Sequence, residues 1–143
     1  GQDTYQTLKY CEVPVVSASA GLCLGGGAEV LMHCDAVQAH SESYVGLVEV
    51  GVGIIPAWGG CKELLGRLMD FELVTNGPMG AVMKAFETIG TAQVAKSAEQ
   101  ARSMGFLGRS QREGKPKIIL GMSAMTFVRV SLTEIAFRCG RES

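Results

Sequence analysis

The chain has 143 residues, of which 47% are hydrophobic and 19% charged. This is enough for one globular domain with a hydrophobic core, and it excludes an intrinsically disordered chain. A formal net charge of −1 excludes a strongly basic surface for nucleic acid or anionic membranes, and no apolar run is long enough to span a membrane.

The N-terminal part predicts a strand, a glycine turn, a helix and a second strand. Weak helical spacing over residues 4–11 precedes a β-branched run over 13–18, which predicts a buried strand. The glycine-rich segment 21–27 predicts a turn, residues 28–34 a short helix, and residues 35–40 a second strand. This order is one βαβ unit, for which parallel strand pairing is the default.

The rest of the chain predicts three more helices. Helical spacing covers residues 59–68, 79–89 and 98–104. Ser97 is placed to cap the last of these helices, and Gly105 is placed to end it.

Two of these helices carry an apolar stripe. In the helix over 59–68, the leucines are expected to face the core, and the polar side is expected to hold Lys62, Glu63 and Arg67. In the helix over 79–89, the stripe is expected in the core or in a subunit interface and is formed by Met79, Val82, Met83, Phe86 and Ile89.

Cysteine and histidine usage predicts neither a disulfide framework nor a metal site. The cysteines are odd in number, no Cys-x-x-Cys pair occurs and no secretory signal opens the sequence. We therefore expect a reduced, cytoplasmic protein whose cysteines act as small apolar residues. The two histidines are too isolated for a metal cluster, and His33 is expected to be a satisfied core residue.

Two glutamates in apolar surroundings are the candidate catalytic groups. Glu29 ends the run Gly25-Gly-Gly-Ala-Glu, and Glu49 lies in the apolar, glycine-rich segment 46–56. A carboxyl group in apolar surroundings tends toward a raised pKa, which suits proton transfer near neutral pH. A glycine turn that opens a helix leaves backbone N–H groups free to hold a developing negative charge. The pattern therefore indicates a proton-transfer enzyme.

Each signal alone has a simpler interpretation. The glycine turn could serve packing, Glu29 could be a first-turn glutamate stabilised by the helix dipole, and Glu49 could be a partly exposed strand residue. The run is not a P-loop, because no Gly-Lys-Ser/Thr follows it, and it lacks the spacing of a dinucleotide-binding fingerprint.

Several ordered motifs together resemble the crotonase superfamily, which includes enoyl-CoA hydratases and isomerases. The motifs are Pro14-Val-Val-Ser-Ala, Leu24-Gly-Gly-Gly-Ala-Glu, His33-Cys-Asp, Gly46-Leu-Val-Glu-Val-Gly-Val-Gly-Ile-Ile-Pro and Gly59-Gly. Val48 and the segments 86–90, 95–99 and 105–107 are most similar to the hydratase-like region of long fusion proteins called 3-hydroxyacyl-CoA dehydrogenases. The resemblance implies an α/β fold, a spiral of ββα units with C-terminal helices that assemble into trimers.

The resemblance also implies roles for individual residues. Glu29 and Glu49 match the two catalytic glutamates, which act as base and acid in the syn hydration of a trans-2-enoyl-CoA in fatty-acid β-oxidation. Gly26 matches the glycine whose N–H forms half of the oxyanion hole. The acyl thioester is expected to lie against Leu24, Gly25, Val48 and Trp58. Trp58 stands where many relatives carry a small residue, which implies a differently shaped pocket.

The sequence departs from the family pattern at both ends. Family members carry a longer segment before Val13, with an Ala-Gly-x-Asp-type motif that supplies the second oxyanion N–H, and this motif does not occur here. We therefore expect an N-terminally truncated crotonase-like domain over residues 1–108 and a divergent tail over 109–143. The expected partners are an acyl-CoA thioester as substrate and either further copies of the chain or a partner chain covering the missing half. No metal or redox cofactor is implied.

A second hypothesis is a non-catalytic crotonase-fold remnant that acts as a binding or assembly module. The absent oxyanion motif separates the two hypotheses. If another chain supplies that motif, the enzyme hypothesis holds, and otherwise the module hypothesis holds.

Overall fold

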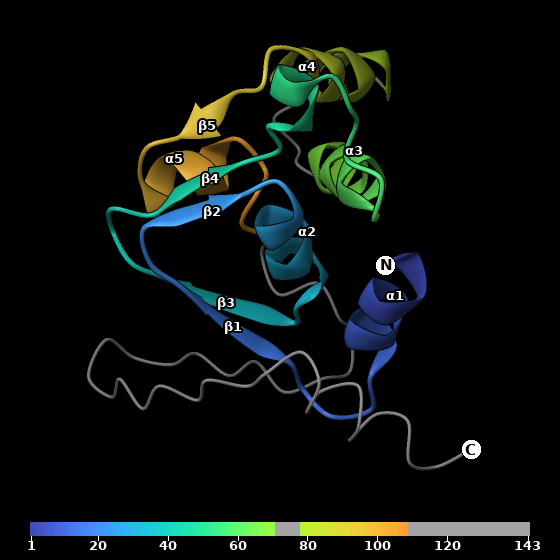
Figure 1. The fold of residues 1–143 in the computed structure, drawn as a ribbon, viewed down its shortest axis with the longest axis vertical. Helices are drawn as coiled ribbons and strands as arrows, with labels where there is room; N and C mark the ends of the chain where they lie inside the picture. Colours follow the sequence, from blue (N-terminus) through green and yellow to red (C-terminus); the bar gives the residue numbers. More distant parts are fainter. Residues whose placement is uncertain (71–77, 109–143) are drawn as a thin grey trace.

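The computed structural model describes residues 1–70 and 78–108, which form a mixed helix and strand fold (Figure 1). The elements run in the order α1 (Gln2–Tyr10), β1 (Val16–Ser19), β2 (Leu22–Leu24), α2 (Gly26–His33), β3 (Ala36–Ala39), β4 (Tyr44–Gly46), the 3-10 helix η1 (Glu49–Val52), α3 (Gly60–Asp70), α4 (Pro78–Gly90), β5 (Val94–Ala95) and α5 (Ala98–Ser103). The predicted tail over 109–143 lies outside the described residues.

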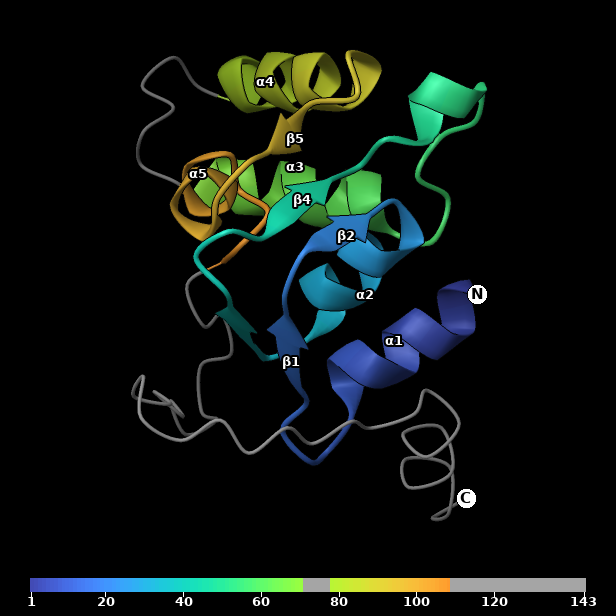
Figure 2. The ribbon, with the colours of Figure 1, turned by 60° about the vertical axis from the view of Figure 1, so that its left-hand side comes forward.

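The strands form two small sheets that repeat one ββα unit. Strand β1 pairs in parallel with β3, and β2 pairs in parallel with β4. The units β1-β2-α2 and β3-β4-α3 therefore stack strand on strand as successive turns of a spiral, with α2 between the two sheets (Figures 1 and 2). Strand β5 adds to β4 in the antiparallel direction. This arrangement confirms the expected crotonase-like α/β fold.

The glycine-rich segment 21–27 is more than a turn, and this corrects the predicted βαβ order. Gly21 and Gly25 adopt positive φ angles of 72° and 56°, which favour glycine. Between these two bends, the apolar residues 22–24 extend as strand β2 and pair with β4. The predicted parallel pairing of the strands on either side, β1 and β3, is confirmed.

The main core lies among α2, α3, α5 and the β2–β4–β5 sheet. Its fully buried members include Leu31, Leu47, Leu64 and Phe106. Helix α1 packs on α2 through a second cluster that includes Tyr5 and Leu8. Helix α5 begins at the predicted cap, because the Ser97 hydroxyl accepts the Gln100 N–H at 3.1 Å, and Gly105 follows the helix at a φ of 88°.

The predicted polar side of α3 is wrong at two positions. Glu63 and Arg67 are each only 6% exposed. Their burial is possible because each has partners: Glu63 forms an ion pair with Lys9, and Arg67 donates to the main-chain carbonyls of Phe106 and Met32. The core side, with Leu64 and Leu68 buried, agrees with the prediction.

Helix α4 buries a different face from the predicted one. Ala81, Ala85 and Thr88 are buried and allow α4 to pack closely against α3. The larger apolar side chains are exposed, namely Met79, Val82, Met83 and Phe86. Of the expected stripe, Ile89 packs partly against the core, and the other four side chains lie on the outside of the described fold. Their role in a subunit interface stays a prediction.

Cys23, Cys34 and Cys61 are free thiols, as predicted, and Cys11 is buried in the same apolar cluster as Tyr5 and Leu8. Across residues 1–70 and 78–108, no helix combines the length and the apolar character needed to cross a membrane.

Candidate active site

Glu29 lies in the first turn of α2, and two backbone N–H groups hold its carboxylate. Its side chain is 2% exposed, and Oε1 accepts the N–H of Trp58 at 3.0 Å and of Gly60 at 2.8 Å. The approach of Gly60 needs glycine, because a Cβ there would lie 2.9 Å from Oε1. The loop that enters α3 therefore fixes the direction in which Glu29 points.

Glu49 is the first residue of η1, so the interpretation as a strand residue is wrong. It is 9% exposed, and neither carboxylate oxygen has a hydrogen-bond partner within the described part of the chain. Burial raises the pKa of Glu49, the nearness of its own main-chain N–H lowers it, and the charge of Glu29 raises it further, so that the net shift is upward. A carboxyl group in this state holds a proton more readily and can donate it to a bound molecule.

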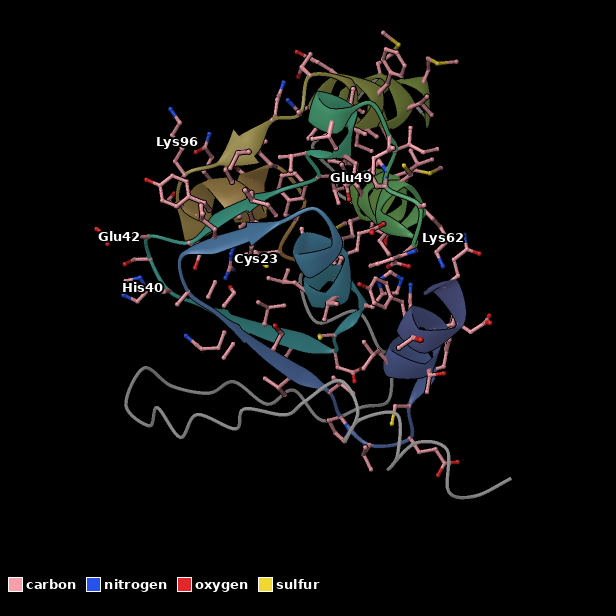
Figure 3. The ribbon with its side chains drawn as sticks, viewed as in Figure 1. Cys23, His40, Glu42, Glu49, Lys62 and Lys96 are labelled. Carbon is pink, nitrogen blue, oxygen red and sulfur yellow. The ribbon has the colours of Figure 1, made fainter. Side chains whose placement is uncertain are left out.

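The glycine turn brings Glu49 to the start of α2. A Cβ on Gly25 would lie 3.6 Å from Glu49 Oε1, so the turn and the carboxylate are in contact. The Gly25 N–H donates to the Gly46 carbonyl at 2.9 Å, and the Glu29 N–H closes the first helical bond to the Gly25 carbonyl at 3.0 Å. Two glutamates that are twenty residues apart in sequence thus meet at one helix N-terminus. Figure 3 shows Glu49 near α3, well away from Glu42 and His40 at the opposite edge of the fold.

The helix N-terminus offers hydrogen-bond donors beside these carboxylates. The first N–H groups of an α-helix have no intrahelical partner, and α2 begins at Gly26. Leu24, Gly25 and Gly26 are half-buried, so this edge is accessible to a ligand. Such a terminus can stabilise an oxyanion.

The Trp58 side chain lies beside the first residue of α2. A Cβ on Gly26 would lie 3.1 Å from the indole Cζ3, and the indole meets the Tyr5 ring edge-on with centroids 5.3 Å apart. Tyr5 also donates from its hydroxyl to the Gly26 carbonyl at 3.2 Å. Trp58 is 45% exposed and forms one apolar wall beside the candidate oxyanion donor. Val48 is half-buried and precedes Glu49 as the N-cap of η1.

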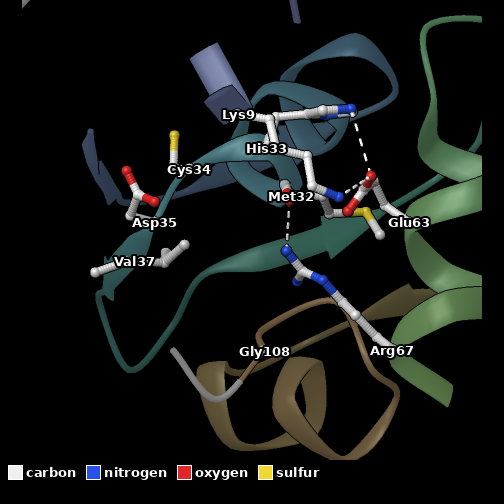
Figure 4. A pocket seen from close by; sticks show the side chains of 10 residues that line it. Lys9, Met32, His33, Cys34, Asp35, Val37, Glu63, Arg67 and Gly108 are labelled. Carbon is white, nitrogen blue, oxygen red and sulfur yellow. Dashed lines mark hydrogen bonds and ion pairs between the residues drawn. The ribbon is translucent and has the colours of Figure 1, made fainter. Parts of the chain in front are cut away.

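A second buried polar cluster is centred on Glu63 (Figure 4). Its Oε1 lies 2.5 Å from Lys9 Nζ, 3.3 Å from Lys62 Nζ and 3.8 Å from His33 Nε2. Burial alone raises the pKa of Glu63, but the hydrogen bond and charge of Lys9, with help from His33 and Lys62, outweigh it and lower the pKa. Burial lowers the pKa of His33 and outweighs its backbone hydrogen bond and the charge of Glu63.

A small pocket of about 140 Å³ adjoins this cluster. Its lining includes Lys9, His33, Glu63 and Arg67 but neither Glu29 nor Glu49. It is therefore distinct from the candidate active site.

Sequence reasoning missed this cluster for an identifiable reason. Lys9 and Glu63 are 54 residues apart, and only the packing of α1 beside α2 and α3 brings them together. The sequence held a partial signal that Glu63 and Arg67 are buried. Each directly precedes a leucine that the helical pattern places in the core.

Comparisons with known proteins identify the family of this chain. A sequence model of the enoyl-CoA hydratase/isomerase family matches residues 1–76. The chain is also 47% identical over 106 residues to a Bacillus subtilis protein named probable 3-hydroxyacyl-CoA dehydrogenase, a match that covers 74% of this chain and 13% of that protein. The chain belongs to the enoyl-CoA hydratase/isomerase family.

Other family members show how much of a whole protein this chain represents. It is 42% identical over 102 residues to a short-chain-enoyl-CoA hydratase of Clostridium acetobutylicum, covering 71% of this chain and 34% of that enzyme. A crystal structure of an enoyl-CoA hydratase from Bacillus anthracis superposes with a TM-score of 0.58 at 30% identity and covers 74% of this chain and 36% of that one. The chain therefore spans about a third of these hydratases.

Proposed function

We propose that this chain carries the acid–base centre of an enoyl-CoA hydratase, which adds water to a trans-2-enoyl-CoA in fatty-acid β-oxidation. The observation that carries the proposal is the meeting of Glu29 and Glu49 at the N-terminus of α2, one held by two N–H groups and the other free of hydrogen-bond partners within the described residues. Relatives named short-chain-enoyl-CoA hydratase and crotonyl-CoA hydratase support the substrate class.

The proposed reaction transfers two protons. Glu29, as a carboxylate, removes a proton from water while the water oxygen bonds to the β-carbon. Glu49, as a carboxylic acid, gives its proton to the α-carbon on the same face, which makes the addition syn. The raised pKa of Glu49 favours the protonated form that this step requires. After product release, a proton passes from Glu29 to Glu49, directly or through solvent, and restores the starting state.

The thioester carbonyl needs stabilisation while the α-carbon carries negative charge. We assign one donor, the Gly26 N–H at the start of α2, and an acyl wall formed by Leu24, Gly25, Val48 and Trp58. The second donor expected for this family would come from a segment outside the present sequence or from a partner chain. Loss of one oxyanion donor typically costs about 10²- to 10³-fold in rate, so activity depends on that contribution.

The assay is hydration of crotonyl-CoA, followed by the loss of enoyl-thioester absorbance. We expect Glu29→Gln and Glu49→Gln each to lower kcat by about 10²- to 10⁴-fold. Glu42→Gln, an exposed carboxyl at the far edge, serves as the matched control and is expected to leave the rate unchanged. A folded protein that shows no hydration, alone or with a partner chain, would instead favour a binding or assembly module.

We further propose that other copies of the chain or a partner chain cover its exposed apolar surface. Large apolar side chains are exposed on α4 and at the end of η1 and the loop after it, where Val52, Ile54 and Ile55 are 60–78% exposed. Soluble monomers rarely expose contiguous apolar patches of large size. Light scattering of the purified chain tests this proposal, and a strictly monomeric, soluble sample would contradict self-association. The cytoplasmic location and the lack of a metal or redox cofactor stay predictions.

A further inference from the structure

His33 lies between the main chain of Glu29 and the loop that holds the Glu29 carboxylate. Its Nδ1 is 2.7 Å from the Glu29 carbonyl oxygen, which can only accept, so Nδ1 carries the proton. In the neutral ring, Nε2 is then an acceptor, and it has no hydrogen-bond partner within the described residues although the side chain is 2% exposed. The ring therefore contacts Glu29 through its main-chain carbonyl and not through its carboxylate.

The other edge of the ring meets Gly59. A Cβ on Gly59 would lie 2.8 Å from His33 Nε2, and Gly59 has a φ of 119° that other residues rarely adopt. Gly59 connects Trp58 and Gly60, whose N–H groups both bind Glu29 Oε1. The position of the His33 ring thus limits where this loop can lie.

Glu63 joins the loop and the ring to α1. Its N–H donates to the Gly59 carbonyl at 2.9 Å, while its carboxylate pairs with Lys9 and lies 3.8 Å from His33 Nε2. One residue therefore contacts the loop through its main chain and the ring through its side chain.

We propose that His33 is a positioning residue for Glu29 and that Glu63, itself fixed by its ion pair with Lys9, limits the movement of the ring by packing beside Nε2. The ring fixes the loop 58–60, and the loop aims the Glu29 carboxylate at the water that it activates. This inference rests on the proposed hydratase function but concerns residues to which that function assigns no role. Neither side chain touches the reacting atoms, so both act through the loop.

The decisive readout is amide hydrogen exchange at Trp58 and Gly60, measured by NMR on the full chain. His33→Asn keeps a side-chain N–H that can point toward the Glu29 carbonyl but removes the ring edge against Gly59. We expect exchange at the two amides to accelerate about tenfold or more, because hydrogen bonds to charged groups contribute about 1.5–3 kcal/mol. Core amides of β4 are expected to keep their wild-type exchange rates.

Glu63→Gln provides a second test that does not depend on the folding of the first variant. We expect acceleration at the same two amides that is smaller than in His33→Asn but larger than any acceleration at the core amides of β4, which report the general loss of stability. The control Glu42→Gln should show none. Unchanged exchange at Trp58 and Gly60 in Glu63→Gln and in folded His33→Asn would overturn the proposal. Equal acceleration throughout the fold would also overturn it, because it would indicate a general loss of stability.

The hydration assay separates this proposal from the proposed function. With an active wild type, we expect His33→Asn to lower kcat about 10- to 100-fold with KM nearly unchanged, because the catalytic carboxylate would be wrongly oriented while substrate binding is kept. An unchanged kcat would contradict the positioning role. If the wild type itself hydrates no crotonyl-CoA, the proposed function fails, and the exchange data still test whether His33 positions the Glu29 carboxylate.

Discussion

Glu49 and Glu63 are nearly equally buried, at 9% and 6% exposure, yet their pKa values shift in opposite directions. Burial raises the pKa in both cases. At Glu63, Lys9 at 2.5 Å and neighbouring positive charges more than offset this effect, whereas at Glu49 the nearby Glu29 adds to it. Burial alone therefore does not assign a role to a carboxyl group.

The two regions consequently suit different tasks. The region of Glu63 is a paired cluster that joins α1 to α3 and borders His33. The region of Glu49 leaves a carboxyl group without a hydrogen-bond partner among the described residues, beside an open helix N-terminus. Unpaired buried acids are costly to stability and are frequent at functional sites.

The largest expected contrast is in the stability of two matched variants. Glu63→Gln removes the charge that neutralises Lys9 and should lower the free energy of unfolding by about 1–3 kcal/mol at pH 7. Glu49→Gln removes an unpaired carboxyl and should change that free energy by less than about 1 kcal/mol. Urea unfolding followed by circular dichroism measures both values. Equal losses of unfolding free energy in the two variants would contradict the assignment of Glu63 as a paired carboxyl group and Glu49 as an unpaired one.

The lysine partners of Glu63 should differ in importance. Lys9 lies closer and is 30% exposed, whereas Lys62 lies 3.3 Å away and is 55% exposed. We expect Lys9→Met to lower the unfolding free energy by about 1 kcal/mol and Lys62→Met by less than about 0.5 kcal/mol. The same urea titrations test this order, and a larger effect of Lys62→Met would contradict it.

The pH dependence of stability should have opposite signs at the two glutamates. The lowered pKa of Glu63 gives a stabilisation that is present above the ordinary value of 4.5 and is lost as pH falls through the lower folded value. The raised pKa of Glu49 gives a stabilisation that is present below 4.5 and is lost as pH rises through the higher folded value.

Unfolding of wild type and both Gln variants between about pH 3 and pH 7 measures these signs. The advantage of the wild type over Glu63→Gln should grow with rising pH. Its advantage over Glu49→Gln should shrink over the same range. If both differences in unfolding free energy changed with pH in the same direction, the pKa values of Glu49 and Glu63 would not be shifted in opposite directions.

The smallest expected effect concerns Cys61, an exposed thiol near the candidate site. Partial desolvation of the thiol raises the pKa of Cys61, and the charges of Glu29 and Glu49 raise it further. Neutralising either glutamate should lower the pKa of Cys61 and speed its alkylation by iodoacetamide a few-fold near pH 8. Cys34, whose pKa burial raises to about 12, is the internal control and should react slowly throughout. Unchanged labelling of Cys61 in both variants would argue against its proximity to the carboxylates.

Much of the candidate site could be predicted from local sequence. The glycine run before Glu29 identified a turn and a helix start, and the glycine-rich stretch around Glu49 identified the second carboxylate. The mixed character of segment 21–27 misled the prediction, because three apolar residues between two glycines are too few to show a strand by periodicity. Strand β2 exists because β4 provides its hydrogen-bond partners.

The same limit explains the errors in α3 and α4. Charged side chains normally indicate a solvent-facing side, but Glu63 and Arg67 are buried because Lys9 and two main-chain carbonyls meet them there. In α4 the apolar stripe was correctly seen in the sequence, but alanines on another face allow a closer approach to α3.

The sequence by itself determined the family, with the ββα spiral that the resemblance implied, and the two candidate catalytic glutamates, because these depend on ordered motifs and on residue type. The residue pattern alone had predicted a βαβ order. Only the tertiary structure decided which carboxyl group is paired and which is not. It also decided that His33 lies between Glu29 and the loop holding it. The physical reason is that a charge responds to every group within a few ångströms, and packing brings those groups together from α1, α2 and α3.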